Sequence, residues 1–199
     1  MLVSIVLFCF IANSMVNNGI MAEIDHKIAD LIKKASFNNR IALFITFWGN
    51  RLTIIIIEIV MLAFCKVYKY HREAIIIFFA VQTEFILNFF LKNFFQRSRP
   101  GSDFFPSSIY GYSFPSGHAM DAACFYGILI YFSFIFIKDK RIKVFNTVFF
   151  SLLILLIGLS RAVLGLHYFS DILGGFCFGI FWASLWILLY KNFSGGKIG

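Results

Sequence analysis

Three reactive side chains stand close together in a chain that is otherwise mostly apolar: Arg161, His167 and Asp171. His167 and Asp171 are four residues apart, and on a helix this spacing places two side chains on the same face. A carboxylate beside one ring nitrogen of a histidine holds the proton there, which leaves the other nitrogen as a nucleophile. The spacing therefore predicts that His167, oriented by Asp171, attacks a group that Arg161 holds.

Two further cations, Lys92 and Arg99, stand at the end of an earlier apolar run. Together with Arg161 they match the charge of a phosphoryl group, whose oxygens favour guanidinium and ammonium donors. The set contains no group of side chains with metal-ligand spacing, so we expect no metal in this site and no cofactor. The three cations indicate phosphoryl chemistry at His167.

A third cluster, Pro115-Ser116-Gly117-His118, stands at the start of another apolar run. Ser116 supplies a hydroxyl, and Gly117 lets an anion approach the free N–H groups at a helix N-terminus. His118 is placed to act as a general acid toward a leaving oxygen. Taken alone, His118 is also typical of a polar helix start, and Lys92 and Arg161 are also typical of basic side chains that reach the membrane surface. The ordered combination favours the catalytic interpretation.

The composition predicts an all-α, polytopic membrane protein with one domain, residues 1–199. Of 199 residues, 60% are hydrophobic and 14% charged, with a mean hydropathy of +0.82. The apolar runs are continuous, unlike the alternating strands of a membrane barrel. The net charge of +8 is spread over helix ends, so a nucleic-acid partner is excluded. Four scattered cysteines predict buried thiols, and neither disulfides nor zinc ligands: Cys9, Cys65, Cys124 and Cys177.

Six transmembrane helices are expected in a bundle. A polar amphipathic segment, 23–51, follows the first of them and predicts a short helix in the membrane interface, broken at Asn38-Asn39. In the last span, Gly175 and Gly179 have the spacing that lets a neighbouring helix approach closely. The expected spans are 2–16, 52–68, 74–91, 118–137, 144–159 and 169–190.

Basic loops set the expected orientation. The lysine-rich loops 66–72 and 138–143 should face the cytoplasm, as should both termini. The loops 92–117 and 160–168 then lie together on the outer side, although the outer segment 17–51 also carries basic residues.

Several other polar residues have open roles in the sequence. Glu58 and Glu84 lie inside apolar spans, and we expect them to face the bundle interior, for a structural bond or for the site. Asp121 either bonds into the site or suits a helix N-terminus. Arg97 either contacts a headgroup or has no role. The aromatic residues of 101–114 fit a lid over a lipid substrate and equally fit an interface belt.

The three clusters resemble the signature of the type 2 phosphatidic acid phosphatase superfamily: KxxxxxxRP, PSGH and SRxxxxxHxxxD. Every defined position is present, and the resemblance covers about residues 85–175, the expected catalytic core. It implies metal-independent hydrolysis through a phosphohistidine on His167, with His118 as the acid. The hydropathy argues against the soluble vanadium haloperoxidases of the same family. The residues implied to bind phosphate are Lys92, Arg99, Ser116, Gly117 and Arg161.

The resemblance implies a phosphatase that acts on a lipid phosphate or diphosphate. The small single domain predicts a bacterial enzyme of the inner membrane, and the basic loops predict that its site is at the outer, periplasmic or extracellular, face. Undecaprenyl diphosphate and phosphatidylglycerophosphate are the first expected substrates, and lipid A and phosphatidic acid are alternatives. Phosphotransfer to an acceptor other than water, a lipid-binding module without turnover, and a non-enzymatic transporter or scaffold are competing functions. The sequence does not indicate an oligomeric state.

Overall fold

The fold is all-α, as predicted. A computed structural model describes residues 1–17, 19–35, 37–100 and 111–193, and in these ranges it contains helices and no strand. The helices are α1 (Leu2–Val16), α2 (Ile20–Ala35), α3 (Asn39–Phe47), α4 (Arg51–Val67), α5 (His71–Phe95), α6 (Gly117–Phe136), α7 (Lys140–Val163) and α8 (Phe169–Phe193).

Four helices in the described part of the chain are long and apolar enough to cross a membrane: α5, α6, α7 and α8. A fifth span results only if α1 and α2, which meet at a bend of 82°, are counted as one. Helix α4 has 17 residues, a rise of about 25 Å against a hydrocarbon core of about 30 Å. The chain is thus a membrane protein with four to five candidate spans, and the predicted number of six is not confirmed.

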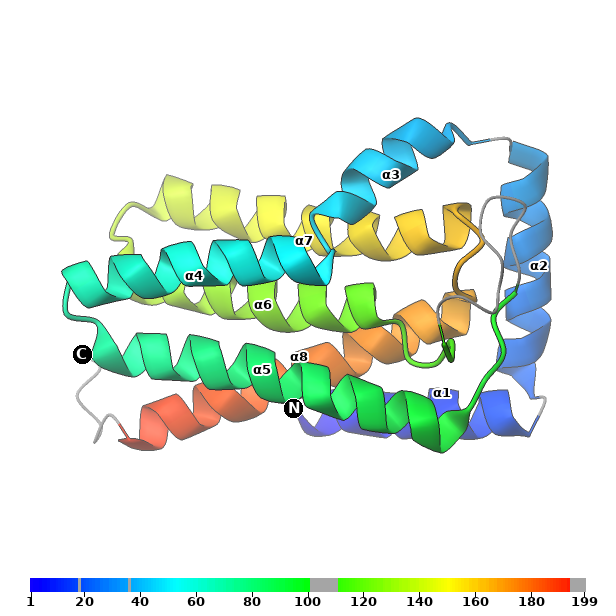
Figure 1. Ribbon diagram of the computed structural model, residues 1–199, viewed down its shortest axis with the longest axis horizontal. Coiled ribbons are helices and arrows are strands. Elements are labelled where there is room, and N and C mark those ends of the chain that lie inside the picture. The colour runs from blue at the N-terminus through cyan, green and yellow to red at the C-terminus, as the bar shows by residue number, and fades with distance from the viewer. Residues whose placement is uncertain (18, 36, 101–110, 194–199) are drawn as a thin grey trace.

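The segment predicted as one broken amphipathic helix forms α2 and α3. The break falls where it was predicted, because the Asn38 side chain accepts the backbone N–H of Arg40 at 2.9 Å and caps α3. Helix α2 crosses one end of the bundle (Figure 1). The C-terminal ends of α5 and α7 and the N-terminal ends of α6 and α8 lie at this same end.

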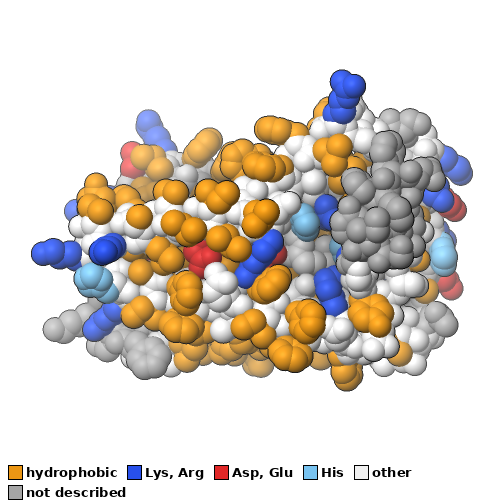
Figure 2. All heavy atoms as spheres, viewed as in Figure 1, with side chains coloured by type: hydrophobic (Ala, Val, Ile, Leu, Met, Phe, Trp, Pro, Cys, Tyr) orange, Lys and Arg blue, Asp and Glu red, His pale blue; other side chains and the backbone are white. Residues whose placement is uncertain are grey.

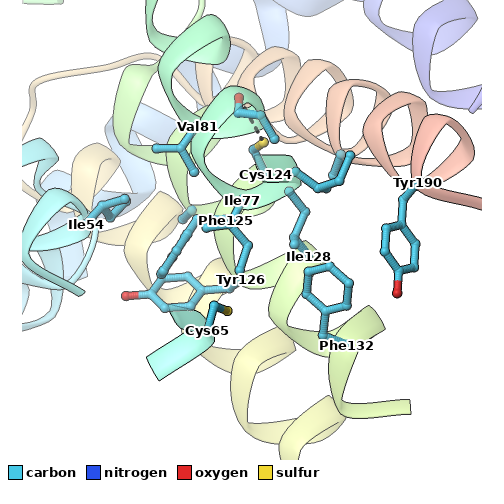
Figure 3. Close-up of a cluster of buried hydrophobic side chains, with 14 of the residues drawn as sticks. Ile54, Cys65, Ile77, Val81, Cys124, Phe125, Tyr126, Ile128, Phe132 and Tyr190 are labelled. Atoms are coloured by element: carbon cyan, nitrogen blue, oxygen red, sulfur yellow. Dashed lines mark hydrogen bonds between the residues drawn. The ribbon is translucent and has the colours of Figure 1, made fainter. Parts of the chain in front are cut away.

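The core of the bundle is aliphatic and aromatic (Figure 3). Ile54 of α4, Ile77 of α5 and Phe125 of α6 are almost fully buried in it. Many large hydrophobic side chains are exposed on the outer side of the bundle, unlike on the surface of a soluble protein. Figure 2 shows them spread over this side. Such a surface is suited to lipid.

Helices α6 and α8 approach each other closely at the predicted glycine pair. A Cβ atom added to Gly175 would lie 2.7 Å from the carbonyl oxygen of Ser116, and one added to Gly179 would lie 2.5 Å from that of Met120. No larger residue fits without displacing backbone. The packing role predicted for this pair is confirmed, and it holds the start of α6 against α8.

The cysteines are free thiols, as predicted. Cys65 and Cys124 are buried, whereas Cys9 is exposed on α1 and Cys177 is only half-buried, so burial was predicted wrongly for these two.

Candidate active site

The loop between α7 and α8 carries His167. Gly165, at φ +66°, ends α7: its N–H donates to Ala162 O at 2.9 Å, and the N–H of Leu166 donates to Arg161 O at 3.0 Å. This pair of bonds is the Schellman arrangement, which needs a left-handed residue after the helix. His167 therefore lies in the expected loop 160–168, and only Asp171 lies on α8. The helical spacing considered for the two residues does not apply.

Asp171 closes the first turn of α8. Its Oδ2 accepts the backbone N–H of Tyr168 at 2.8 Å, which is the return half of a capping box. The carboxylate is fully buried and its main chain is also engaged, because Asp171 O accepts the N–H of Ser116 at 3.0 Å. The start of α8 is thereby joined to the start of α6.

A serine connects His167 to Asp171. Nδ1 of His167 and Oδ2 of Asp171 are 3.6 Å apart, beyond hydrogen-bond distance. Ser113 Oγ lies between them, 3.2 Å from Nδ1 and 2.5 Å from Oδ2, to which it donates. The predicted pairing is thus made largely through Ser113, a loop residue with no distinguishing pattern in the sequence.

The electrostatics of the site keep His167 neutral. Burial, followed by the charges of Lys92, Arg99 and Arg161, holds the pKa of the His167 imidazole well below its ordinary value. A neutral imidazole keeps a lone pair on one nitrogen. The three predicted cations therefore converge on this ring from α5, from the segment after it, and from α7.

Each cation is held by the protein. Lys92 Nζ donates to Tyr112 O at 2.7 Å, and Arg161 Nη1 donates to Thr46 Oγ1 at 2.8 Å. Arg99 donates from Nη1 to Leu166 O at 2.8 Å and from Nε to Gly111 O at 3.0 Å. These bonds fix the three basic side chains beside His167, and basic side chains suit an anion.

Ser116 and Gly117 begin α6 beside this cluster. Ser116 Oγ is buried and has no hydrogen-bond partner among the described residues, which is costly unless a ligand supplies one. Gly117 stands against Asn88, since a Cβ atom would lie 3.2 Å from Asn88 Oδ1. A buried hydroxyl beside the N-terminus of a helix is an arrangement that suits an anion.

His118 is the second residue of α6 and is half-buried. Its ring lies beside the turn between α3 and α4, where a Cβ atom on Gly49 would be 3.5 Å from Cδ2 of His118. The N-terminal end of α6, which carries His118, lies at the same end of the bundle as the start of α8, which follows His167 (Figure 1).

Three polar side chains outside the signature also reach this end. Arg97 donates to Asp171 and to Asp25, and Ser170 donates to Asp25. The sequence left the role of Arg97 open and placed Asp25 among the polar residues of an amphipathic helix, but Asp25 is only 2% exposed. The sequence pattern does not distinguish a buried aspartate on an amphipathic helix from an exposed one, so the burial of Asp25 was not predicted.

Three further acidic residues, Glu58, Glu84 and Asp121, lie deeper in the bundle. Glu58 and Glu84 are 2% and 1% exposed, so the prediction that they face the interior is confirmed. Gln82 donates to Glu58 at 2.7 Å, and Asp121 pairs with Arg51 at 2.8 Å. Asp121 therefore belongs to a structural network of α4, α5 and α6.

The structure describes only the last residues, 111–114, of the aromatic segment 101–114. Phe104, Phe105, Ile109 and Tyr110 lie outside the described residues. Phe114 is fully buried and packs on Phe8 and Phe95, with ring centroids 5.6 and 4.9 Å away. It is a core residue, so both alternatives, the lid and the interface belt, are wrong at this position.

Comparison with known proteins agrees with this architecture. The family model described as "PAP2 superfamily" matches residues 73–194. The chain is 30% identical over 200 residues to phosphatidylglycerophosphatase B of Bacillus subtilis, covering 96% of this chain and 93% of the relative.

Two solved structures share the fold. A transmembrane PAP2-type phosphatidylglycerolphosphate phosphatase from Bacillus subtilis has a TM-score of 0.84 and 25% identity, over 98% of this chain and 96% of that one. LpxE of Aquifex aeolicus has a TM-score of 0.63 and 22% identity, over 81% and 93% of the two chains. The match to the family model over most of the chain, together with these relatives, shows that this chain belongs to the PAP2 superfamily.

Proposed function

We propose that the chain is a lipid phosphatase that removes the terminal phosphate of phosphatidylglycerophosphate through a phosphohistidine on His167. The main support is the neutral, buried His167 among three cations. The substrate is proposed from the names of two relatives, a phosphatidylglycerophosphatase B and a phosphatidylglycerolphosphate phosphatase. Undecaprenyl diphosphate, lipid A and phosphatidic acid are secondary candidates.

The reaction proceeds in two displacements. Nε2 of His167 attacks phosphorus and the bond from phosphorus to the lipid oxygen breaks, while His118 gives that oxygen a proton. Water then attacks phosphorus, His118 takes a proton from it, and the P–N bond breaks to release phosphate. The Nδ1–H group stays bonded to Ser113, and Asp171 stabilises the positive charge on the ring in both steps.

The phosphoryl oxygens are held by the cation cluster and by the start of α6. Lys92, Arg99 and Arg161 offset the charge that develops on these oxygens. Ser116 Oγ, buried and without a partner among the described residues, donates to one of them, and the backbone at Gly117 approaches another. With this set of donors we expect no divalent ion to be needed.

The proposed topology has six spans in one domain of residues 1–199. Helices α1 and α4 complete the four long spans, and α2 lies in the interface. The basic segments 66–72 and 138–143 are at the cytoplasmic side, so the site is at the outer face of the plasma membrane. There the headgroup of a lipid reaches His167 while its acyl chains stay in the bilayer.

The test is phosphate release by purified protein in detergent with EDTA present. The panel contains phosphatidylglycerophosphate, undecaprenyl diphosphate, phosphatidic acid and lipid A. His167→Ala is measured in parallel, with His71→Ala as the control because His71 is exposed at the start of α5.

Release from phosphatidylglycerophosphate that survives EDTA, vanishes in His167→Ala and persists in His71→Ala is expected. Faster phosphate release from another lipid of the panel would identify that lipid, and not phosphatidylglycerophosphate, as the substrate. Release abolished by EDTA would contradict the metal-free mechanism. Folded protein without release from any lipid would overturn the function.

A further inference from the structure

Arg97 joins two buried carboxylates that are far apart in the sequence. Its Nη2 lies 2.7 Å from Oδ2 of Asp25, and its Nη1 lies 2.5 Å from Oδ1 of Asp171. The side chains of Asp25 and Asp171 are 2% and 0% exposed. Arg97 thus connects α2, at the end of the bundle, to the acid that serves His167.

Asp25 also binds the first turn of α8 directly. Its Oδ1 accepts the backbone N–H of Ser170 at 2.8 Å, and its Oδ2 accepts the Ser170 hydroxyl at 2.6 Å. A carboxylate at free N–H groups of a helix N-terminus is stabilised by the helix dipole. Helix α2 is therefore fixed to the turn that carries Asp171.

Two carboxylates surround the single positive charge of Arg97. Burial disfavours the charged form of Arg97, but Asp171 and Asp25 outweigh it and hold the pKa of the guanidinium above its ordinary value. The ring of Tyr168 covers the guanidinium at 4.1 Å. A half-buried arginine that is paired and stacked has little freedom, so it is a rigid support for a carboxylate.

The Asp171 carboxylate is consequently held from both sides. Arg97 binds Oδ1, while Ser113 and the N–H of Tyr168 bind Oδ2. Its orientation decides where Ser113 points, and Ser113 in turn receives Nδ1–H of His167. A shift of Asp171 would misdirect the nucleophilic nitrogen.

We propose that Asp25 and Arg97 are positioning residues of the active site: Arg97, anchored by Asp25 of α2, fixes Asp171 and through it the tautomer and direction of His167. The inference rests on the proposed function, since it concerns the same nucleophile. It makes α2 part of the catalytic apparatus. We expect that a lysine does not replace Arg97, because an ammonium group lacks the rigid planar fork in which Nη1 and Nη2 each bond one carboxylate.

A cavity beside Arg97 allows a direct test. Its volume is about 420 Å³, and Asp25, Arg97 and Tyr168 form part of its wall. If Arg97 is shortened to alanine, a guanidinium ion can enter from this cavity and lie between the two carboxylates. A role in orientation predicts that added guanidinium chloride restores activity, whereas sodium chloride at equal ionic strength does not.

The experiment compares Arg97→Ala, Arg97→Lys and Asp25→Asn. The matched controls are Arg40→Ala and Arg40→Lys on α3 and Asp30→Asn on α2, because Arg40 and Asp30 are exposed. We measure kcat and KM for phosphatidylglycerophosphate, and the titration of His167 by nitrogen-15 NMR in detergent, assigned with His167→Ala.

Both Arg97 variants are expected to lower kcat about 10- to 100-fold, the loss expected from a small misplacement of a reacting group, while KM stays within about threefold. Guanidinium restores Arg97→Ala. Asp25→Asn also lowers kcat, whereas the control variants leave kcat unchanged. Unchanged kcat in both Arg97→Lys and Asp25→Asn would overturn the proposal, as would a change confined to KM.

The titration separates this inference from the proposed function. Within the part of the chain that the structure describes, the charged or titratable groups around His167 are Lys92 of α5, Arg99, His118 of α6, Arg161 of α7 and Asp171 of α8. None of them changes in these variants. Loss of the Arg97 charge should raise the pKa of His167 and loss of the Asp25 charge should lower it. A pKa of His167 that is unchanged in both Arg97→Ala and Asp25→Asn contradicts the positioning role, whether or not the wild type releases phosphate from a lipid. A wild-type protein that releases no phosphate contradicts only the proposed function.

Discussion

Nη1 of Arg99 lies 3.1 Å from Nε2 of His167. A guanidinium group can only donate hydrogen bonds, so Nε2 accepts, and the proton of the neutral ring is on Nδ1. This tautomer follows from the bonding network and places the lone pair on the nitrogen that faces the cations. A phosphoryl group brought to Nε2 meets Arg99 at once.

The tautomer predicts a phosphoenzyme on His167. Brief mixing with phosphorus-32-labelled phosphatidylglycerophosphate and quenching in alkali should leave label on the protein, because a P–N bond survives alkali and breaks in acid. His167→Ala should carry no label and should lose at least about 10⁴-fold in kcat, as other enzymes do without their nucleophile.

The matched variant for this prediction is His71→Ala, which removes an exposed histidine from the first turn of α5. It should label like the wild type. Label that survives acid, or that persists in His167→Ala, would assign the covalent step to another residue.

The depressed pKa of His167 predicts the acid limit of activity. In the proposed mechanism the neutral ring is the nucleophile. As pH falls, kcat/KM should therefore stay level through about 6.5, the ordinary pKa of histidine, and decline only below it. Replacing a neighbouring cation should raise the pKa, because the imidazolium is then repelled less. Arg161→Gln should therefore move the acid limb to higher pH, besides raising KM.

Ionisation of the phosphate ester also falls in this range, near pH 6 for a phosphomonoester. The comparison of wild type with Arg161→Gln on one lipid removes this contribution, since the substrate is the same. An acid limb that stays in place in Arg161→Gln would show that His167 does not set it.

Ser113 should contribute to kcat, although in the proposed mechanism it does not contact the substrate. Ser113→Ala removes the hydroxyl between Nδ1 and Asp171, which leaves the two 3.6 Å apart. A hydrogen bond to a charged group is worth about 1.5–3 kcal/mol, so we expect kcat to fall about 10- to 100-fold. Ser151→Ala, at an exposed position of α7, is the control, and an unchanged kcat in Ser113→Ala would mean that Asp171 reaches the ring by itself.

The sequence was most informative where chemistry and hydropathy act along the chain. Continuous apolar runs predicted the ends of α4, α6 and α8 to within a few residues, because an apolar helix in lipid ends where polar residues begin. The ordered clusters predicted which side chains would meet, and Lys92, Arg99 and Arg161 do converge on His167.

What the sequence missed depends on tertiary contact. Asp25 and Ser113 look like ordinary polar residues of a helix and a loop, and only packing against α8 makes them buried partners of the site. The sequence pattern also did not determine the number of membrane spans, because α1 has 15 residues and turns sharply into α2. Length and hydropathy alone do not describe such a bend.

The approach of α6 and α8 gives a prediction about stability. Gly179→Ala would place a Cβ atom 2.5 Å from Met120 O and 2.9 Å from Ala123 Cβ. The helices must separate to admit it, and such overpacking costs about 1–3 kcal/mol. The apparent melting temperature in detergent should fall by several degrees, and kcat should fall too, because the same contact holds the start of α6 against the turn of Asp171.

Gly127→Ala on α6 is the matched substitution, since its Cβ atom would have only Ala183 Cβ nearby, at 3.9 Å. That distance is an ordinary contact, and alanine is favoured over glycine within a helix by about 1 kcal/mol. Gly127→Ala should therefore melt at or above the wild-type temperature. If the two variants melt alike, α6 and α8 have room to adjust, and the close approach of the two helices does not limit stability.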